Sequence, residues 1–299
     1  PVPAPGPDPA ARPVAPGLHF VATPIGAARD ITLRALDILA AADVLAAEDT
    51  RSLRHLMDIH GIPLSGRPLI AYHDHNGAAV RPRLIAALAE GRSVAYAAEA
   101  GTPLVADPGF QLARAAIAEG YPVHAAPGPS ALLAALTVAG LPTDRFLFAG
   151  FLPAQQGPRR SALAELAAVP ATIVLYESPK RISRTLGELC ESFGREREAA
   201  VCRELTKRFE TVMRGTLGAL AETFAGAEVR GECVLVIARP QAVPGDWAAA
   251  EPALRAALAE HAPAAAATAV AARFGLPRRA VYARALVLQA GDAGHVDED

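Results

Sequence analysis

Short apolar runs alternate along the first half of the chain with longer segments whose apolar residues recur at helical spacing. Each run has the length of one buried strand, and small or Pro-rich turns separate the segments. The pattern predicts strands at residues 18–22, 44–47, 70–73, 94–97 and 123–126, and helices at residues 31–42, 51–60, 81–90, 110–119 and 130–139. Alternation of this kind predicts a mostly parallel sheet that is covered by helices on both faces.

The pattern is interrupted around residues 150–160, where the sequence reads FLPAQQGPRR, and a second αβ unit follows. There we predict strands at 172–176, 199–203 and 233–238 and helices at 181–193 and 217–224. Residues 247–290 are almost all helix-forming, and they predict a small helix-turn-helix module with helices at 253–260, 264–273 and 278–288. The predicted domains are therefore a disordered Pro-rich leader (1–16), a first α/β domain (17–150), a second α/β domain (151–243) and a helical module with an acidic tail (244–299).

Composition excludes several classes of protein. A chain of 299 residues that is 52% hydrophobic and 20% charged can bury one large core or two of ordinary size, so it is neither a disordered protein nor a disulfide miniprotein. No apolar run reaches 18 residues, and we expect no membrane span. Cys190, Cys202 and Cys233 are widely spaced and odd in number, which predicts free, buried thiols and a cytoplasmic location.

Charge gives no sign of a general nucleic-acid binder. The chain has 29 basic and 31 acidic residues, for a net charge of −2. Without an overall positive charge, any RNA or DNA site must be local. The expected nucleic-acid partner is RNA, and no DNA partner is expected.

Four turns follow directly after predicted strands, at residues 23–26, 48–51, 99–103 and 127–130. Open α/β sheets bind ligands at this position. None of the turns reads GxGxxG or GxxxxGK[ST], so neither the dinucleotide motif nor the P-loop is present. Each turn taken alone is more often an ordinary connection between a strand and a helix. Four such turns in the same topological position favour a ligand site.

Several motifs carry a family resemblance. They are VATPIG with DITLRAL (21–36), AAEDTR (46–51), YHDHN (72–76), EAGTPLVADPG (99–109), PGPSALLAAL (127–136), GLPTDRFLFAGFLP (140–153), YESPKR (176–181) and RELTK (203–207). In this order they resemble the ribosomal RNA small-subunit methyltransferase I family, which belongs to the tetrapyrrole-methylase superfamily. The segment AARFGLPRRAVYARAL (271–286) resembles that family's C-terminal helical module.

The resemblance implies a fold and an activity. The fold is α/β, with two αβα domains of the tetrapyrrole-methylase type and a cofactor cleft between them. The activity is S-adenosylmethionine-dependent methylation of the ribose 2′-oxygen of a cytidine in the decoding region of small-subunit ribosomal RNA. The partners are that RNA, free or in the assembled subunit, and a second copy of the chain in a homodimer.

The turns and the resemblance together predict a cofactor site. Its residues are Pro24, Gly26, Glu99, Ala100, Gly101, Thr102, Asp107, Ser130 and Ala131, with Tyr176, Glu177 and Leu205 opposite. This chain has Ala98-Glu99 where the family usually has Ser-Asp, and Ala27-Ala28 after Gly26 where it usually has Asn-Leu. Both departures bear on cofactor affinity.

Asp49, Arg51, Glu204 and Lys207 are the predicted catalytic residues, because methyl transfer needs an aligned hydroxyl and a destination for its proton. From spacing alone, Asp49 and Arg51 are equally well explained as a helix cap with a local ion pair. His73 and His75 point to one face as metal ligands would, but without a third ligand nearby we predict no metal and expect polar lining of a cleft.

Arg159, Arg160, Arg278, Arg279 and Arg284 are the predicted RNA-binding residues. A run of Arg without acidic residues is otherwise more often a solvated helix face. Two other functions stay open. One is a tetrapyrrole-ring methylase, and the other is a non-catalytic RNA-binding assembly factor that has lost methyl transfer through the changes at Ala98 and Glu99.

Overall fold

The computed structural model describes residues 13–105, 109–240 and 247–293, with side chains through residue 289. The predicted leader lies almost entirely outside the described residues, as do Asp107 and the acidic tail. The described chain forms two compact units, which divide between Arg239 and Pro240.

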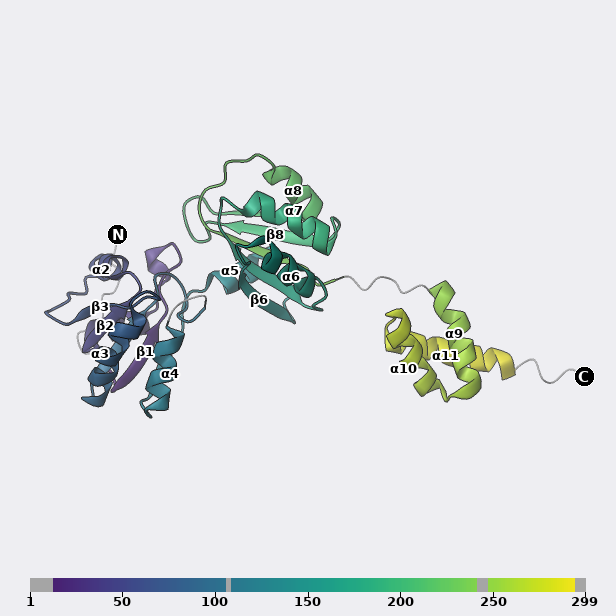
Figure 1. Ribbon diagram of the computed structural model, residues 1–299, viewed down its shortest axis with the longest axis horizontal. Helices are drawn as coiled ribbons and strands as arrows, with labels where there is room; N and C mark the ends of the chain where they lie inside the picture. Colours follow the sequence, from purple (N-terminus) through teal and green to yellow (C-terminus); the bar gives the residue numbers. More distant parts are fainter. Residues whose placement is uncertain (1–12, 106–108, 241–246, 294–299) are drawn as a thin grey trace, which may run out of the picture. The chain divides into compact units, whose positions relative to one another are not determined.

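The first sheet of the larger unit is all parallel, as predicted (Figure 1). Its strand order is β3-β2-β4-β1-β5, with β1 at Gly17–Val21, β2 at Val44–Ala47, β3 at Leu69–Ala71, β4 at Ser93–Ala97 and β5 at Val123–Ala126. Four helices and one 3₁₀ turn connect them, namely η1 (Ala28–Asp30), α1 (Leu33–Ala41), α2 (Thr50–Ile59), α3 (Gly77–Ala89) and α4 (Phe110–Ala118).

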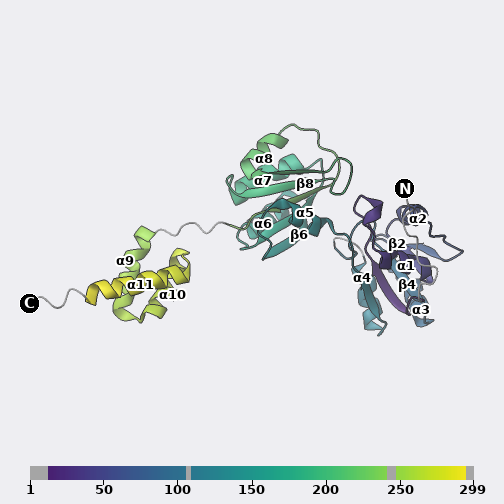
Figure 2. The same ribbon diagram turned by 180° about the vertical axis from the view of Figure 1, so that it is seen from behind.

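Alternating side chains of these strands pack on opposite faces of the sheet. Leu45 lies in a cluster with apolar residues of α1 and α2, while Val44 lies in another with residues of α3 and α4. The view from behind shows α1 and α3 against the same sheet (Figure 2). Because both faces are covered, the strands read as continuous apolar runs.

The second sheet is mixed and carries elements that the sequence pattern did not predict. Its order is β6-β7-β10-β8-β9, and only the β6–β7 pair is parallel. The strands are β6 (Phe146–Phe151), β7 (Thr172–Glu177), β8 (Glu198–Arg203), β9 (Thr211–Thr216) and β10 (Cys233–Ile237). The helix α5 (Ala131–Ala139) covers one face, and α6 (Gln156–Ala167), α7 (Ile182–Phe193) and α8 (Leu217–Phe224) cover the other.

The second α/β layer begins earlier in the chain than the predicted boundary at 150/151. The strand β6 starts at Phe146, and α5, which precedes it, packs on β8 and β10 of the same sheet through Ala135 and Leu136. The three cysteines are buried free thiols in this layer, as predicted.

The smaller unit is a three-helix bundle of α9 (Trp247–Glu260), α10 (Pro263–Phe274) and α11 (Arg278–Ala293). Leu254, Val270 and Val281 are among the residues of its own apolar core. A left-handed Gly275 ends α10, which matches the predicted turn between the last two helices. Among the described residues, no helix combines the length and apolar character needed to cross a membrane.

Candidate functional site

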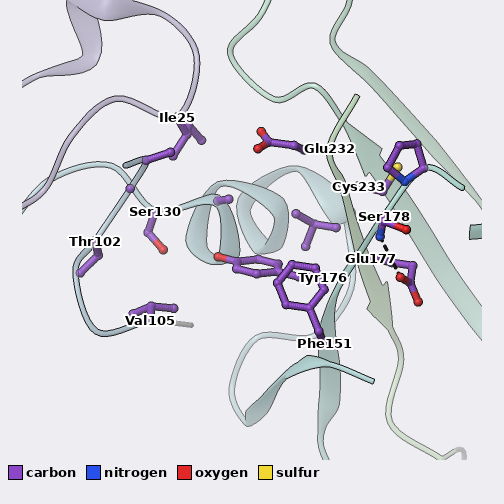
Figure 3. A pocket seen from close by; sticks show the side chains of 15 residues that line it. Ile25, Thr102, Val105, Ser130, Phe151, Tyr176, Glu177, Ser178, Glu232 and Cys233 are labelled. Atoms are coloured by element: carbon purple, nitrogen blue, oxygen red, sulfur yellow. Dashed lines mark hydrogen bonds between the residues drawn. The ribbon is translucent and has the colours of Figure 1, made fainter. Parts of the chain in front are cut away.

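A cavity of about 300 Å³ lies where the turns of the first sheet meet the strand ends of the second (Figure 3). Its first wall comes from the segments after β1, β4 and β5, namely Ile25, Ala100, Gly101, Thr102, Val105, Ser130 and Ala131. Its second wall comes from β6, β7 and β10 and the residues beside them, namely Phe151, Tyr176, Glu177, Ser178, Pro179, Glu232, Cys233 and Val234. The structure therefore brings together seven of the twelve predicted cofactor residues, from both halves of the unit.

Backbone hydrogen bonds lock the turns of the first wall together. Thr23 and Gly101 exchange N–H···O bonds of 2.9 and 3.0 Å, and the Thr102 hydroxyl donates to the Pro129 carbonyl at 2.9 Å. Gly101 has φ +79°, and a Cβ added there would lie 3.3 Å from Ile25 Cγ2. A larger residue at 101 would thus strain the backbone and press on the cavity wall.

An aromatic group forms part of the second wall. The Tyr176 ring lies edge-on to Phe148 and Phe151, at centroid distances of 4.8 and 5.7 Å. Its hydroxyl accepts a hydrogen bond from Leu132 N at 3.2 Å, which links the strand end to the start of α5. Burial raises the pKa of Tyr176, so the phenol stays neutral at physiological pH. Figure 3 shows this ring facing the cavity beside Phe151.

Glu177 lines the cavity, but its carboxylate is hydrogen-bonded to other residues of the protein. Its side chain is 1% exposed and accepts hydrogen bonds from Arg181 at 2.7 Å, Thr185 at 2.7 Å and its neighbour Ser178 N at 2.8 Å. These donors leave the carboxylate paired within the protein, so its predicted contact with a cofactor would have to use a lone pair that they leave open.

The structure corrects the prediction for Arg159. This residue is 2% exposed, and its guanidinium lies between the carboxylates of Glu177 and Glu188, at 3.4 and 2.5 Å. It also donates to Thr185 at 2.6 Å. A buried Arg whose donors are engaged in this way cannot contact an RNA phosphate, whereas its neighbour Arg160 is exposed.

Three of the predicted cofactor residues lie in a different hollow. Pro24, Gly26 and Glu99 line a space of about 270 Å³ against α2, together with Ser52 and His55. Thr23 lines this hollow and Gly101 lines the cavity, so their backbone bridge lies between the two spaces. The spaces share two loops but are bounded by different side chains.

Asp49 and Arg51 form a helix cap with a local ion pair, which is one of the two explanations that the sequence analysis gave for them. The Asp49 carboxylate accepts from Arg51 N at 2.8 Å and pairs with the Arg51 guanidinium at 2.9 Å. These bonds from Arg51 lower the pKa of Asp49 to about 2. Arg51 is 90% exposed in its side chain, so the pair presents donors to solvent at the start of α2.

Glu204 and Lys207 belong to a small ionic cluster beside the cavity. Lys207 Nζ lies 3.0 Å from Glu204 and 2.8 Å from Glu232. A backbone hydrogen bond from Glu232 lowers the pKa of Glu204. Burial acts to lower the pKa of Lys207, but the carboxylates of Glu232 and Glu204 outweigh it, so the pKa of Lys207 is raised. Both groups stay charged at neutral pH, so neither is tuned as a general base. The remaining cofactor candidate, Leu205, is buried in the apolar core beside α5.

The arginines of the smaller unit differ in how they are held. Arg284 pairs with Glu251 at 2.6 Å, and Arg278 donates to the Thr268 hydroxyl at 2.9 Å. Arg279 is exposed on α11.

The two histidines of the YHDHN motif lie close to each other. The ring centroids of His73 and His75 are 6.0 Å apart. No group of three or more potential metal ligands occurs among the residues that the structure describes.

The cavity also contains residues that the sequence analysis did not single out. Ile25, Val105 and Phe151 supply apolar surface, and Glu232, Cys233 and Val234 come from the start of β10. Ser178 and Pro179 lie inside the quoted YESPKR motif, which could have pointed to them. Antiparallel pairing of β10 with β7 puts Cys233 opposite Glu177, and no local sequence signal reports that pairing.

Two family models match the chain. The model described as Tetrapyrrole (Corrin/Porphyrin) Methylases matches residues 17–221, and the model described as RsmI C-terminal HTH domain matches residues 244–289. Among curated relatives, a Mesorhizobium japonicum protein named ribosomal RNA small subunit methyltransferase I is 50% identical over 294 residues, covering 95% of this chain and 97% of its own. The Escherichia coli O157:H7 protein of that name is 40% identical, covering 91% and 95%.

Solved structures share the fold at lower identity. A cobalt precorrin-4 methyltransferase aligns with a TM-score of 0.57 and 18% identity, over 74% of this chain and 94% of its own. A Thermus thermophilus uroporphyrin-III C-methyltransferase, solved in complex with S-adenyl homocysteine, aligns with a TM-score of 0.53 and 20% identity, over 74% of this chain and 97% of its own. These likenesses support the two-layer α/β architecture.

Proposed function

This chain belongs to the tetrapyrrole methylase family and, within it, to the proteins named ribosomal RNA small subunit methyltransferase I; from that membership we propose that it methylates small-subunit ribosomal RNA with S-adenosylmethionine as methyl donor. The finer proposal is transfer to the ribose 2′-oxygen of a cytidine in the decoding region. The observation that carries the proposal is the cavity between the two walls, in a chain that matches the Mesorhizobium japonicum relative over 97% of its length.

The residues of the cavity fit S-adenosylmethionine. Its volume of about 300 Å³ lies at the lower end of the range for small-molecule sites. Val105, Phe151 and Tyr176 offer apolar and aromatic surface for an adenine ring, and aromatic faces also attract a cation such as sulfonium. Gly101 places no side chain at the cavity wall, which leaves room for the ligand to approach the loop.

The bound donor would supply a methyl group on a sulfonium, which is a good leaving group. The chain's own contribution is then mostly placement. The apolar wall limits water, the bridged loops fix the width of the first wall, and the Tyr176–Leu132 bond fixes the second wall against α5. Placement alone can supply a large part of a rate enhancement.

Asp49 and Arg51 act in this proposal as substrate-placing residues. Asp49, with a pKa of about 2, is a weak proton acceptor. Arg51 keeps an exposed guanidinium at the carboxyl edge of the first sheet, where it can meet a phosphate in bidentate geometry. Glu204 and Lys207 are proposed to hold the β8–β9 connection beside the cavity rather than to transfer a proton.

RNA binding is assigned to local basic groups, because the chain as a whole is slightly acidic. Arg160, Arg278 and Arg279 remain as proposed phosphate contacts, and Arg284 contributes where its pairing with Glu251 leaves donors open. The match of residues 244–289 to a helix-turn-helix model supports a nucleic-acid role for the smaller unit.

A homodimer is part of the proposal. Phe110 and Ile117 on α4 are 55% and 63% exposed, and we propose that a second copy of the chain covers them. Sedimentation velocity on the full chain gives the mass directly. A cytoplasmic location stays a prediction.

The test of the function is methyl transfer in vitro. Calorimetry should give saturable binding of S-adenosylmethionine, and radiolabelled methyl should enter small ribosomal subunits from a strain that lacks the modification. Binding without transfer to any RNA substrate would favour the assembly-factor alternative. Transfer to a uroporphyrinogen or precorrin but not to RNA would favour the ring-methylase alternative.

A further inference from the structure

The turn at residues 207–210, between β8 and β9, carries an aromatic side chain, Phe209, that does not line the cavity. Phe209 is 66% exposed, the largest exposed fraction among the large apolar side chains that the structure describes. The Arg208 guanidinium lies over its ring, with Cζ 5.4 Å from the centroid. A ring at this exposure is accessible, so a ligand that covered it would gain the free energy of burying its apolar surface.

This turn is held by hydrogen bonds on both sides of its tip. Lys207 N donates to Glu204 O at 3.0 Å, and Glu210 N donates to Lys207 O at 3.2 Å. The Glu210 carboxylate accepts from Thr206 N at 2.5 Å. Arg208 and Phe209 therefore occupy the two central positions of a closed turn, so the backbone that carries the ring is ordered before any partner arrives.

The root of the turn is attached to the loop after β1 and to the second wall of the cavity. Thr206 Oγ1 accepts from Ala27 N at 3.1 Å, next to Gly26 in the loop after β1. A Cβ added at Gly26 would lie 2.5 Å from Lys207 Cγ, so the two loops are in close contact. Lys207 Nζ lies 2.8 Å from Glu232, which lines the cavity. The exposed ring is thus only two residues from a side chain fixed at the edge of the cavity.

The tip of the turn carries a positive charge, whereas the ionic cluster at its root is acidic overall. Lys207 neutralises part of the charge of Glu204 and Glu232, and Arg208 brings a guanidinium to the exposed tip. Glu210 uses one oxygen on the backbone of the turn itself. A planar guanidinium next to an exposed aromatic ring is the combination on which unpaired nucleobases stack.

We propose that Phe209 and Arg208 form a stacking platform for an unpaired base of the RNA substrate, adjacent to the nucleotide that is methylated. This inference rests on the proposed function, since it assigns a positioning role toward the same substrate. Stacking on a fixed turn orients the strand across the cavity and places the target ribose. The platform reads no particular base, because every base offers a flat face.

The experiment compares Phe209→Ala with Phe209→Trp and Phe209→Tyr in the full chain. Leu33→Ala is the matched control, because Leu33 is a 63% exposed apolar residue at the start of α1 that does not line the cavity. Two RNA readouts are taken: the KM and kcat for methylation of unmodified small subunits, and the fluorescence of a short single-stranded RNA with 2-aminopurine, which is quenched when the base stacks. Cofactor affinity is measured by calorimetry for every variant.

Phe209→Ala should weaken RNA binding about 5- to 150-fold, the range that loss of one base–aromatic stack produces. The loss should appear as a raised KM with unchanged cofactor affinity and with loss of 2-aminopurine quenching. Phe209→Trp and Phe209→Tyr should restore both, and Leu33→Ala should match the wild type.

If the wild type methylates RNA but Phe209→Ala retains its KM and its quenching, the platform is refuted while the proposed function stands. A change of sedimenting mass in Phe209→Ala without loss of RNA affinity would likewise overturn it, in favour of a contact between copies of the chain. Failure of the wild type to bind S-adenosylmethionine or to methylate RNA would instead refute the proposed function.

Discussion

Arg159 and Glu177 form an ion pair in the interior of the second α/β layer, with N···O 3.4 Å and side chains 3% and 1% exposed. The pair links α6 to the end of β7, where Glu177 lines the cavity. Removing water from two charges is costly. Here Glu177 also accepts hydrogen bonds from Thr185 and Arg181, and Arg159 also pairs with Glu188, which offsets that cost. A residue at the edge of an apparent linker is therefore part of the support of the site.

Arg159→Met should destabilise the protein by about 3–5 kcal/mol, because it leaves the Glu177 and Glu188 carboxylates without their shared partner. Urea unfolding of the full chain measures this. The neighbouring change Arg160→Ala should alter stability by no more than about 0.5 kcal/mol and weaken RNA binding instead. Equal stabilities for the two variants would show that the buried network contributes little.

Asp49→Asn should lower methylation far more than it lowers Tm. Asn also caps helices well, so the fold should keep its N-cap while the charge that orients Arg51 is lost. Misplacement of a substrate-holding group can cost about 10²-fold in turnover. The contrary result is a fall in Tm with turnover unchanged, which would make the pair a structural cap only.

The Asp49 pair should also be insensitive to pH across the physiological range. The pKa of Asp49 is lowered to about 2, so its contribution is present above the unfolded-state pKa and is lost only as pH falls toward 2. The pH profile of activity should be measured for the wild type and for Asp49→Asn. Between the unfolded-state pKa of an Asp and neutral pH, the two profiles should have the same shape.

Gly101→Val should weaken binding of S-adenosylmethionine by at least about tenfold, since the added side chain meets Ile25 at the cavity wall. The same substitution at Gly91 is the control. Gly91 has φ +74° but no atom within 4 Å of an added Cβ, so it reports the backbone strain without the cavity contact. If calorimetry gives equal affinities for the two variants, S-adenosylmethionine does not bind in this cavity.

Arg279→Ala should reduce RNA affinity and flatten its dependence on salt by about 0.7 unit of slope, the change expected for one phosphate contact on a single strand. Stability of the smaller unit should not change, because Arg279 is exposed. Arg284→Ala should instead lower that stability through loss of the Glu251 contact. Binding isotherms at several salt concentrations test the first result, and an unchanged slope would remove Arg279 from the RNA surface.

The first layer could be predicted from sequence because each of its elements carries its own signal. Its strands are apolar runs bounded by turns, and the turns follow strands on one edge of a parallel sheet, which placed Gly101, Thr102 and Ser130 together. The YESPKR motif added the opposite wall, with Tyr176 and Glu177.

The second layer was harder to predict because its signals are weaker or non-local. The edge strand β6 has a register shift between Phe148 and Gly150, and α6 carries Pro158 in its first turn, where proline is tolerated. Both features read as loop. The burial of Arg159 and the pairing of Cys233 with Glu177 depend on contacts between distant segments, which spacing along the chain cannot report.

The decisive measurement of the proposed activity is a map of ribose methylation in small-subunit ribosomal RNA from cells with and without this protein. We predict one cytidine in the decoding region that carries a 2′-O-methyl group when the protein is present and lacks it in the deletion. Re-expression of the wild type should restore the mark, and Gly101→Val should not. An identical methylation pattern in both strains would contradict the proposed activity.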